Sequence, residues 1–595
     1  MKNELSSINT GKTADVPAIC LIRPPAVESF RFATTSTTLP LGLAYIAAAL
    51  EKHKRKVTVV DAVGEAPDNR TRYYKGYLLG LDLGEIVARI PPETALVGIT
   101  VVFTHEWPVV VQLVELIKAA RPDLTVVLGG EHISSMPEFS LMTSKADILV
   151  MGEGEEIIID LVDALESGRE LSGIEGIAYR DGAKIIINRR RARKTDIDSI
   201  PFPAWHHFKV KTYHENRFVG GMYSSSLTIP ILGTRGCPYQ CTYCSAPNMW
   251  TPQWIPRDPV KVVDEIQHYV ETYGARNFPF QDLTAIIRKD WIVTFCREII
   301  KRDLKIAWQF PTGTRAEAVD PEVAGLLRES GMISMAYAPE SASEVTRQFI
   351  KKKMKTDGLF DSIRAATDAK LNVIIFLVIG FPHDITERIL ENMPYLDRFA
   401  KEGVTDVSVG FYMALPGTQL FYSLYDAGKI RLNRDYFRHI LDSLSLWPSQ
   451  SYCSLSRLEL AVLKLRIFLG FYGAKRQLSG RGALMTSVKR ALSGFGKGQH
   501  ESKLQTAFRN GMTSAWDCMR VQFKPGWMPR KQEFEMFENW DAIFESIRRQ
   551  KRAGGVYAAA PADTSQLHLV NVIPLVRQDH GASRIFSIPD LAIKA

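Results

Sequence analysis

Short apolar runs alternate with segments of helical composition over the first part of the chain, between residues 18 and 151. Continuous apolar runs separated by helices are typical of a parallel sheet that is covered on both faces. The pattern therefore predicts a doubly wound α/β domain over residues 15–170. Its expected strands are Ala18–Arg23, Lys56–Asp61, Ala95–Val102, Leu124–Gly129 and Asp147–Met151, and its expected helices include Leu41–Leu50 and Val111–Ala120.

A second alternation lies between residues 227 and 413, where six apolar runs are separated by helical stretches. Six strand–helix units over about 190 residues are too few for a complete eight-unit barrel. An open, partial (β/α)6 barrel similar to a TIM barrel fits this count, and we place it at residues 223–425. The expected barrel strands begin at Leu227, Asn277, Lys305, Ile333, Asn372 and Asp406.

The remaining segments differ in composition from these two units. Residues 171–222 contain a hairpin pattern that turns at Asp181-Gly182, followed by a linker. The charged run Arg189–Lys194 in this linker is expected to be a solvated face, with contact to a substrate as the alternative. Residues 426–550 are expected to form a helical C-terminal domain, and residues 551–595 a mobile tail.

The composition limits the functional class. Among 595 residues, 46% are hydrophobic and 23% are charged, which excludes a disordered, collagenous or coiled-coil chain. No run of about 18 uncharged apolar residues occurs, and the first residues lack the apolar core of a signal peptide, so we expect a cytoplasmic protein. The net charge of +9 permits an anionic substrate, a membrane surface or nucleic acid and selects none of them.

Three of the seven cysteines lie within eight residues, immediately after the first expected barrel strand. Cys237, Cys241 and Cys244 have the spacing Cys-x3-Cys-x2-Cys, which arises by chance in on the order of one chain in a thousand. A structural zinc site needs four ligands, and the pair His206-His207 lies about thirty residues upstream. Three thiolates at a barrel mouth suit instead an iron–sulfur cluster with one open iron, where a small molecule can bind and receive an electron.

This loop, placed after the first strand of a partial barrel, resembles the hallmark of the radical S-adenosylmethionine (SAM) superfamily. The resemblance implies that Cys237, Cys241 and Cys244 hold a catalytic [4Fe–4S] cluster, whose fourth iron chelates the amino and carboxylate groups of SAM. One-electron reduction then cleaves SAM to methionine and a 5′-deoxyadenosyl radical, which abstracts hydrogen from unactivated carbon. The cofactor supplies the radical, and the protein supplies orientation and exclusion of water.

Further segments fall where this superfamily has its SAM contacts. Tyr243, beside the last cysteine, matches the aromatic position that packs near the adenine, and Asp282 ends the second expected strand, where it would face the cluster. Glu340 and Ser341 end the fourth strand in a segment that resembles the one contacting the ribose and methionine parts of SAM. Gly380 belongs to a stretch similar to the GxPxET stretch after strand five.

The doubly wound domain contains the segments Pro40–Ala47, Val59–Asp61, Gly129–Ser134 and Gly152–Glu155. With these segments it resembles the Rossmann-like cobalamin-binding domain of cobalamin-dependent radical SAM enzymes. A flat corrin needs the open carboxyl edge of a parallel sheet and glycines for close approach, and both are present. The DxHxxG signature, which supplies a histidine to cobalt in many cobalamin proteins, is absent, so the resemblance implies a cobalt without a histidine from this protein. The expected cobalamin contacts are Gly129, Gly130, His132, Ser134, Gly152 and Glu153, and the alternative for His132 is a polar residue at a strand end.

The resemblance implies a class B radical SAM methyltransferase. One SAM would methylate cob(I)alamin, a second would yield the radical that takes a substrate hydrogen, and the substrate radical would collect the methyl group. The alternatives are a cobalamin-assisted cyclisation or rearrangement without methyl transfer, and a non-catalytic cobalamin or iron–sulfur sensor. Methylthiotransferases share the domain order, but their N-terminal domain carries three further cysteines, and here only Cys20 precedes the cluster. Cys296, Cys453 and Cys518 are expected to be core residues.

The segment Ser456–Glu459 has the pattern of a capping box that opens a helix. This helix continues through Leu460–Tyr472 and is flanked by basic residues, so it can lie in a membrane interface, with a core helix as the alternative. The expected partners are a small-molecule or lipid-like substrate, an electron donor such as flavodoxin or ferredoxin, and a membrane surface if the helix is interfacial. No interleaved aromatic and basic platform occurs, so we expect no nucleic acid.

Overall fold

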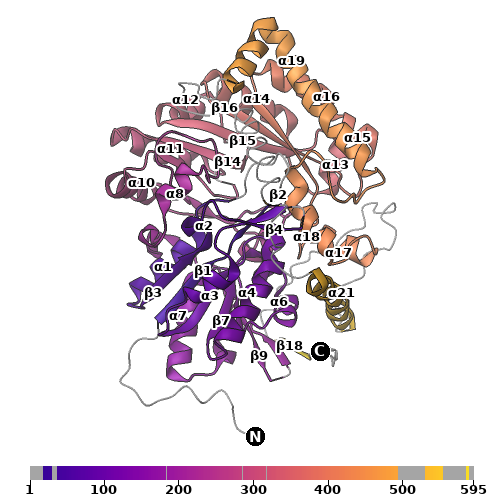
Figure 1. Cartoon of the computed structure of the whole chain (residues 1–595). Helices are drawn as coiled ribbons and strands as arrows, with labels where there is room; N and C mark the ends of the chain where they lie inside the picture. The colour runs from indigo at the N-terminus through magenta and orange to yellow at the C-terminus, as the bar shows by residue number, and fades with distance from the viewer. Residues whose placement is uncertain are drawn as a thin grey trace.

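The computed structural model describes residues 18–29, 37–74, 76–182, 184–284, 286–315, 318–492, 521, 530–553 and 584–587. Two α/β units follow each other along the chain, and helices of the C-terminal region lie against them (Figure 1). Cys518 and most of the tail expected at 551–595 lie outside the described residues. None of the described helices combines the length and the apolarity that a bilayer crossing requires.

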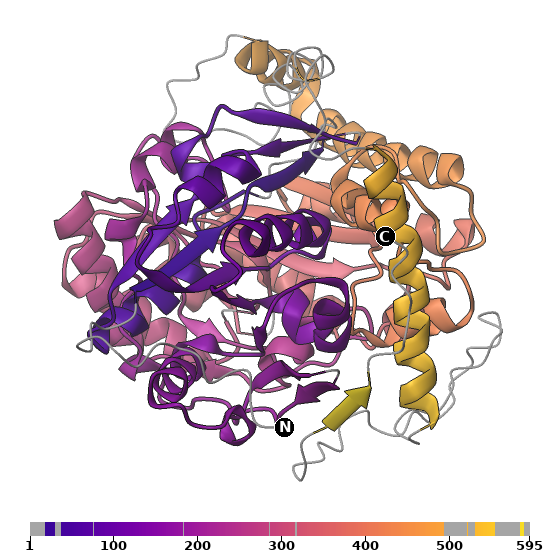
Figure 2. The same cartoon turned by 60° about the horizontal axis from the view of Figure 1, so that its bottom comes forward.

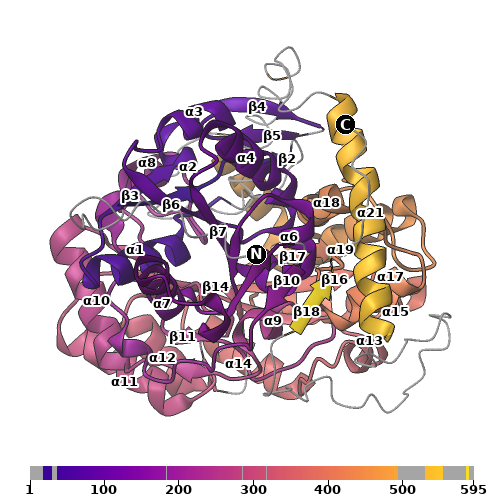
Figure 3. The same cartoon turned by 90° about the horizontal axis from the view of Figure 1, so that it is seen from below.

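The N-terminal unit is built on an eight-stranded sheet with the order β18-β10-β9-β8-β7-β6-β1-β3. The five strands from β8 to β3 are parallel, as the sequence predicts. The antiparallel hairpin of β9 and β10 extends the sheet, and β18 from the far end of the chain pairs with β10 (Figure 3). The strands are β1 (Ala18–Arg23), β3 (Val57–Asp61), β6 (Thr94–Thr100), β7 (Thr125–Gly129), β8 (Ile148–Val150), β9 (Ile177–Asp181), β10 (Lys184–Ile187) and β18 (Arg584–Ser587).

Helices cover both faces of this sheet, because successive side chains of a strand point to opposite faces. Ile19 and Leu21 of β1 belong to one apolar core together with α1 and α7, whereas Cys20 and Ile22 belong to a second core with α4. This arrangement confirms the doubly wound prediction. The helices are α1 (Leu41–Lys52), α3 (Leu83–Ala88), α4 (Trp107–Ala120), α5 (Glu131–Ser135), α6 (Pro137–Thr143) and α7 (Gly154–Ser167).

A small antiparallel sheet, with the order β2-β5-β4, was not predicted from the sequence. It begins three residues after β1, where Pro24 and Pro25 lack the N–H groups that would continue the parallel ladder. Val27 and Thr71 both pair with Leu78 of the middle strand. The sheet therefore lies at the carboxyl end of β1, and its strands are β2 (Ala26–Ser29), β4 (Arg70–Tyr73) and β5 (Gly76–Leu79).

The second unit contains the expected partial barrel, with five adjacent parallel strands in the order β13-β14-β15-β16-β17. The first expected strand contacts β13 only through two isolated bridges, Thr228 to Asn277 and Ile231 to Phe280. Ile229 N and Ile231 N donate to the carbonyl oxygens of Asn277 and Pro279, so the ladder bond missing between the bridges is the one from residue 279 to the Ile229 carbonyl, and Pro279 has no N–H to donate. The elements are β11 (Thr234–Arg235), α9 (Ala246–Trp250), β12 (Ile255–Pro256), α10 (Pro259–Tyr273), β13 (Asn277–Pro279), α11 (Lys289–Lys301), β14 (Ala307–Thr314), α12 (Pro321–Glu329), β15 (Met332–Glu340), α14 (Thr356–Asp368), β16 (Asn372–Ile379), α16 (Asn392–Lys401) and β17 (Asp406–Phe411).

The described part of the C-terminal region is mostly helical, as expected. α19 begins with the predicted capping box: Ser456 N donates to Glu459 Oε2 at 2.7 Å, and Glu459 N donates to Ser456 Oγ at 3.2 Å. α21, yellow in Figure 2, returns to the N-terminal unit, where Trp540 packs against Phe139 with a ring separation of 5.7 Å. The helices are α17 (Gln419–Asp426), α18 (Arg434–Leu441), α19 (Arg457–Leu492) and α21 (Arg530–Ala553).

Candidate functional site

The cysteine loop borders a large cavity between the two α/β units. Cys237, Cys241 and Cys244 follow β11, and all three line a cavity of about 1030 Å³. Burial raises the pKa of the Cys244 thiol to about 12, so its proton leaves readily only when a cation replaces it. Three thiols on one wall of a cavity fit an iron–sulfur cluster that keeps one iron free for a ligand.

Two buried hydroxyls on the same cavity also fit a bound ligand. The side-chain oxygens of Thr284 and Thr314 are buried and have no hydrogen-bond partner among the described residues, and both residues line the cavity. Buried polar groups without a partner are rare in proteins, because each costs free energy unless something satisfies it. A polar ligand such as SAM, seated beside the cysteines, would supply the missing partners.

Tyr243 and Glu340 form a polar contact beside the cysteines. Tyr243 Oη donates to Glu340 Oε1 at 2.8 Å, and Lys352 Nζ lies 3.1 Å from the same oxygen. Burial and the neighbouring Glu340 carboxylate raise the pKa of Tyr243 well above its usual value. Glu340 ends β15 with a φ of +65°, a conformation that costs a non-glycine residue free energy and that gathers at functional sites. All three residues line the cavity.

Asp282 lies behind the cysteine loop, and it is not among the residues that line the cavity. Its carboxylate is fully buried and accepts hydrogen bonds from Gly233 N at 3.0 Å and from Thr234 Oγ1 at 2.6 Å. Burial raises its pKa to about 6 despite these two bonds. Asp282 therefore anchors the base of the cysteine loop to the barrel.

Ser341 and Gly380 also support turns behind the cavity wall. Ser341 is buried; its hydroxyl accepts a hydrogen bond from Ser343 N at 3.1 Å, and its carbonyl accepts one from Arg347 at 2.9 Å. Gly380 N donates to Asp384 Oδ2 at 2.8 Å. Neither Ser341 nor Gly380 lines the described cavity, so of the five expected SAM contacts only Tyr243 and Glu340 do.

The opposite wall comes from residues that were missed in the sequence. It includes Glu28 and Ser29 of β2, Arg70 and Tyr77 of the small sheet, and Phe103 after β6. β1 and β6 are neighbours in the sheet although they are not consecutive, so the order of the strands reverses between them. Ligands of open α/β sheets bind in the crevice at this reversal. If a flavodoxin-like strand order had been assumed for the predicted strands, the position of this crevice would have followed from the sequence.

The expected cobalamin contacts gather elsewhere, at the carboxyl ends of β7 and β8. Gly152 N donates to Ser134 Oγ at 2.9 Å, which joins the two loops. Gly130 has a φ of +126°, and a Cβ there would lie 2.5 Å from the Val101 carbonyl oxygen, so only glycine fits. None of the six residues lines the described cavity; they are Gly129, Gly130, His132, Ser134, Gly152 and Glu153.

His132 is a buried residue of the N-terminal core. Only 1% of it is exposed, its Nδ1 lies 3.2 Å from Thr104 Oγ1, and its ring packs 4.9 Å from that of Trp107. Burial lowers its pKa to about 3, so the ring is neutral. No histidine occurs among the described residues that line the cavity; that cobalt takes no histidine from this protein stays a prediction.

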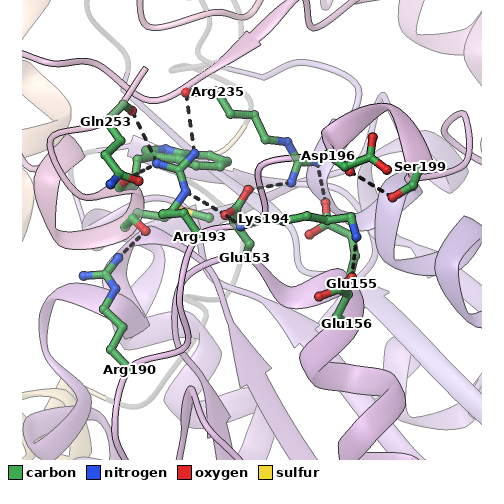
Figure 4. Close-up of polar contacts among 12 residues, drawn as sticks. Glu153, Glu155, Glu156, Arg190, Arg193, Lys194, Asp196, Ser199, Arg235 and Gln253 are labelled. Atoms are coloured by element: carbon green, nitrogen blue, oxygen red, sulfur yellow. Dashed lines mark hydrogen bonds and ion pairs between the residues drawn. The ribbon is translucent and has the colours of Figure 1, made fainter. Parts of the chain in front are cut away.

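Glu153 belongs to an ion-pair network with two arginines (Figure 4). Its two carboxylate oxygens lie 2.6 Å from Arg193 Nε and 3.0 Å from Arg235 Nη1. Arg193 comes from the charged linker, and only 5% of its side chain is exposed. The prediction of a solvated face is therefore wrong for Arg193, because the linker runs between the two units.

Two family models match the chain. Residues 33–162 match the B12 binding domain, and residues 231–393 match the radical SAM superfamily. These segments contain the middle of the first α/β unit, from α1 to most of α7, and the cysteine loop with most of the barrel.

Several curated proteins are similar over most of the chain. An uncharacterized methyltransferase of Pyrococcus horikoshii is 27% identical over 68% of this chain and 83% of its own length. Cytidylyl-2-hydroxyethylphosphonate methyltransferase of Streptomyces wedmorensis is 26% identical over 73% of this chain and 88% of its own. An anaerobic magnesium-protoporphyrin IX monomethyl ester cyclase of Rubrivivax gelatinosus is 28% identical over 52% and 55%.

Two solved structures share the fold. The radical SAM methyltransferase TsrM of Kitasatospora setae, with cobalamin and a [4Fe–4S] cluster bound, matches with a TM-score of 0.54 and 18% identity over 70% of this chain and 79% of its own. The cobalamin-dependent radical enzyme OxsB, with aqua-cobalamin and SAM bound, matches with a TM-score of 0.58 and 14% identity over 89% and 84%. At these identities the likeness concerns the fold.

Proposed function

The chain joins a B12-binding domain to a radical SAM domain and is a cobalamin-dependent radical SAM enzyme, and from this premise we propose that it methylates an unactivated carbon of a small-molecule or lipid-like substrate. One observation carries the proposal. The cysteine loop and the strand-order reversal of the N-terminal unit open into the same cavity of about 1030 Å³. A radical generated at one wall would therefore meet a methyl donor held at the other.

The residues of the cavity would have three roles: they would hold the cluster, orient SAM and exclude water. When bound, the [4Fe–4S] cluster and SAM supply a 5′-deoxyadenosyl radical, and cobalamin carries a methyl group. Cys237, Cys241 and Cys244 would hold the cluster, and the Glu340 carboxylate, with Lys352 beside it, is placed to orient the polar end of SAM. Apolar side chains such as Phe376 and Phe411 line the barrel part and exclude water from a reactive intermediate.

The experiment is anaerobic reconstitution of the full chain, followed by incubation with reductant, candidate substrates and SAM that carries a labelled methyl group. We expect 5′-deoxyadenosine and a labelled methylated product in equal amounts. 5′-Deoxyadenosine with a transformed but unlabelled product would overturn the methylation proposal. Cys241→Ala serves as the control that cannot hold the cluster.

A radical cyclisation without methyl transfer is the second candidate. It is favoured by the relative from Rubrivivax gelatinosus, whose name describes a cyclase and which is 28% identical to this chain over 52% of its length. The same cavity serves either reaction, because both begin with hydrogen abstraction from the substrate. The labelled methyl group separates the two outcomes.

We propose that the reductant is an acidic electron-transfer protein such as flavodoxin or ferredoxin. Cys241 Sγ lies 4.0 Å from the Lys351 carbonyl oxygen. Lys351, Lys353 and Lys355 are exposed, so this side of the cysteine loop presents positive charge to the solvent. Attraction of opposite charges would steer such a partner toward the cluster, and high salt should slow the reduction.

We also propose that α19 contacts an anionic membrane surface. Leu458, Val462, Leu465 and Leu469 are spaced by one helical turn, and each is more than half exposed. Arg466 and Arg476 are exposed on the same helix, a combination that suits anionic lipid headgroups. The free thiols suit a reducing compartment, so we place the contact at the cytoplasmic face.

Co-sedimentation with vesicles of phosphatidylserine and phosphatidylcholine tests this contact. The wild type should sediment with the anionic vesicles, and Leu465→Ser with Leu469→Ser should weaken the binding about tenfold or more, because two exposed apolar side chains are lost. Equal sedimentation of the wild type with purely neutral vesicles, or none at all, would contradict the proposal.

A further inference from the structure

Four charged side chains from three parts of the molecule meet beside the cysteine loop (Figure 4). Arg235 belongs to β11, Arg193 belongs to the linker, and Glu153 and Glu155 lie at the start of α7 in the B12-binding domain. We name these four residues the inter-domain clamp. None of them lines the cavity, although Glu153 is one of the expected cobalamin contacts.

The clamp is a continuous chain of ion pairs. Glu153 bridges the two arginines, with one carboxylate oxygen 2.6 Å from Arg193 Nε and the other 3.0 Å from Arg235 Nη1. Glu155 Oε1 lies 2.5 Å from Arg235 Nη2. Arg235 therefore binds two carboxylates of the B12-binding domain at once, with the fork geometry that only arginine offers.

The clamp is also buried. The four side chains are between 4% and 11% exposed, and the guanidinium of Arg235 lies over the rings of Tyr45 at 5.2 Å and Trp250 at 5.7 Å. Ion pairs on a surface are weak, but removal of one partner from a buried pair leaves a charge that neither water nor protein compensates. The clamp should thus hold its elements together more firmly than the exposed charges nearby.

The clamp binds the chain on both sides of the cysteine loop. Arg235 precedes Cys237 by two residues, and Gly236 between them has a φ of +87°, where a Cβ would lie 2.1 Å from the Gln253 carbonyl oxygen. Arg193 donates to the Trp250 carbonyl, at the end of the helix that follows the last cysteine. Beside the clamp, Asn248 Nδ2 donates to Ser135 Oγ at 3.2 Å, a direct contact between α9 and the B12-binding domain.

The barrel already has its own anchor for this loop. Asp282 binds Gly233 N and Thr234 Oγ1, so the loop base is fixed to the barrel without Arg235. The ion pairs of the next residue, Arg235, connect the loop to the other domain and are not needed to build the barrel. Its effect is to fix the cysteine loop relative to the B12-binding domain.

We propose that Arg235, Glu153 and Glu155 are positioning residues that set the distance and orientation between the cluster loop and the cobalamin-binding edge. This inference rests on the proposed function only in that both cofactors must meet over one substrate. It would hold for methyl transfer and for cyclisation alike.

Glu155→Gln and Glu156→Gln make a matched pair of variants. Glu156 is the next residue of α7, is 46% exposed, and pairs with Lys194 at 2.5 Å, outside the clamp. The first readout is amide hydrogen exchange of residues 234–250 in the full chain, both before and after reconstitution. Glu155→Gln should speed this exchange on the order of a hundredfold, with α11 unchanged, whereas Glu156→Gln should leave it at the wild-type rate.

The second readout is the electron paramagnetic resonance (EPR) spectrum of the reduced cluster with SAM. A loop released from the clamp should give a broadened or double set of g-values in Glu155→Gln and a single wild-type set in Glu156→Gln. If Glu155→Gln fails to fold, Arg235→Lys is the second variant. It keeps the positive charge but loses the two-pronged guanidinium, so the cysteine loop should loosen in the same way.

The proposal would be overturned by identical exchange and identical spectra in Glu155→Gln and Glu156→Gln. It would also be overturned if exchange rose uniformly over both domains of a folded variant, because the clamp would then act on general stability alone. Failure of methyl transfer with a loosened loop would leave the clamp standing and refute only the proposed reaction, so the two failures are distinguishable.

Discussion

At the scale of single residues, the cysteine loop is the part whose chemistry follows most directly from the sequence. Three thiols at the observed spacing can all face one cavity, and all three line it in the structure. Residue type and spacing suffice to predict the cluster ligands, because the three cysteines are close together in the chain and an iron–sulfur cluster prefers thiolate donors.

Cys241→Ala should lose SAM cleavage to background while the fold persists, because the cluster then lacks one of three ligands. The measurement is 5′-deoxyadenosine formed per chain by reconstituted protein, with circular dichroism as the check on folding. Cys453→Ala is the matched control, since that thiol is half-buried but contacts Ser451 rather than the cavity. Cleavage at the wild-type rate in Cys241→Ala would refute the cluster assignment.

His132 should make stability depend on pH. Burial lowers its pKa to about 3 in the folded chain, whereas the unfolded residue titrates near about 6.5. Below pH about 6.5 the unfolded state therefore binds a proton at His132, whereas the folded state does not. The free energy of unfolding falls as the pH falls, by about 2 kcal/mol between neutral pH and pH 5.

The check is urea unfolding of wild type and His132→Gln at pH 8 and pH 5. The wild type should lose more free energy of unfolding on acidification than the variant, and both should bind the same amount of cobalamin. Parallel pH profiles with loss of cobalamin in the variant would show instead that His132 contacts the corrin.

Other residues lie where the sequence puts them but do different work. Asp282 and Glu153 follow β13 and β8 at the expected edge, yet Asp282 binds the loop backbone and Glu153 binds two arginines. A place directly after a parallel strand predicts that a residue lies at the carboxyl edge of the sheet. It does not predict which neighbour from a distant segment its side chain meets, and that neighbour decides the role.

At the scale of elements, the buried parallel strands were predictable and the exposed or irregular ones were not. Runs such as Ala18–Arg23 and Asn372–Ile379 are apolar throughout because both faces are covered. β4 has the polar sequence Arg70–Tyr73, and β18 pairs with a strand about 400 residues away in the chain, so neither carries a local signal. The first barrel strand, which the apolar run at Leu227 had suggested, is interrupted because Pro279 of the neighbouring strand cannot donate to it.

The end of β15 should combine strain with ligand binding. Glu340→Gly relieves the positive φ but leaves Lys352 without its carboxylate, so SAM affinity should fall about tenfold or more. Lys370→Gly is the control: Lys370 has a similar φ of +63° and is exposed, so this change should stabilise the chain by about 0.5–1 kcal/mol and leave SAM affinity unchanged. Equilibrium binding of SAM to the reconstituted variants decides, and unchanged affinity in Glu340→Gly would contradict the role given to Glu340.

At the scale of the whole molecule, domain order was readable from the sequence but domain contact was not. The two alternations predict two α/β units, and the charged run Arg189–Lys194 in the linker between them was expected to be a solvated face. Its buried Arg193 and the return of α21 to the N-terminal unit both depend on contacts between segments far apart in the chain. Such contacts leave no periodic pattern.

Trp540→Ala should destabilise the junction between α21 and the N-terminal unit. Trp540 is 3% exposed and packs against Phe139, Phe437 and Phe537, so its truncation should cost about 3–5 kcal/mol. Trp447→Ala, at a position that is 43% exposed, should cost less than about 1 kcal/mol. Urea unfolding followed by circular dichroism compares them, and equal losses would mean that α21 does not depend on this contact.

The shared cavity is the central claim, and EPR spectroscopy of the doubly reconstituted chain tests it most directly. Both the reduced [4Fe–4S] cluster and the cobalt(II) form of cobalamin are paramagnetic. If both occupy the cavity of about 1030 Å³, their spectra should broaden or split through mutual coupling, and removal of either cofactor should restore the simple spectrum of the other. Two unperturbed spectra that simply add, or a cluster that forms on a chain unable to retain cobalamin, would contradict the account.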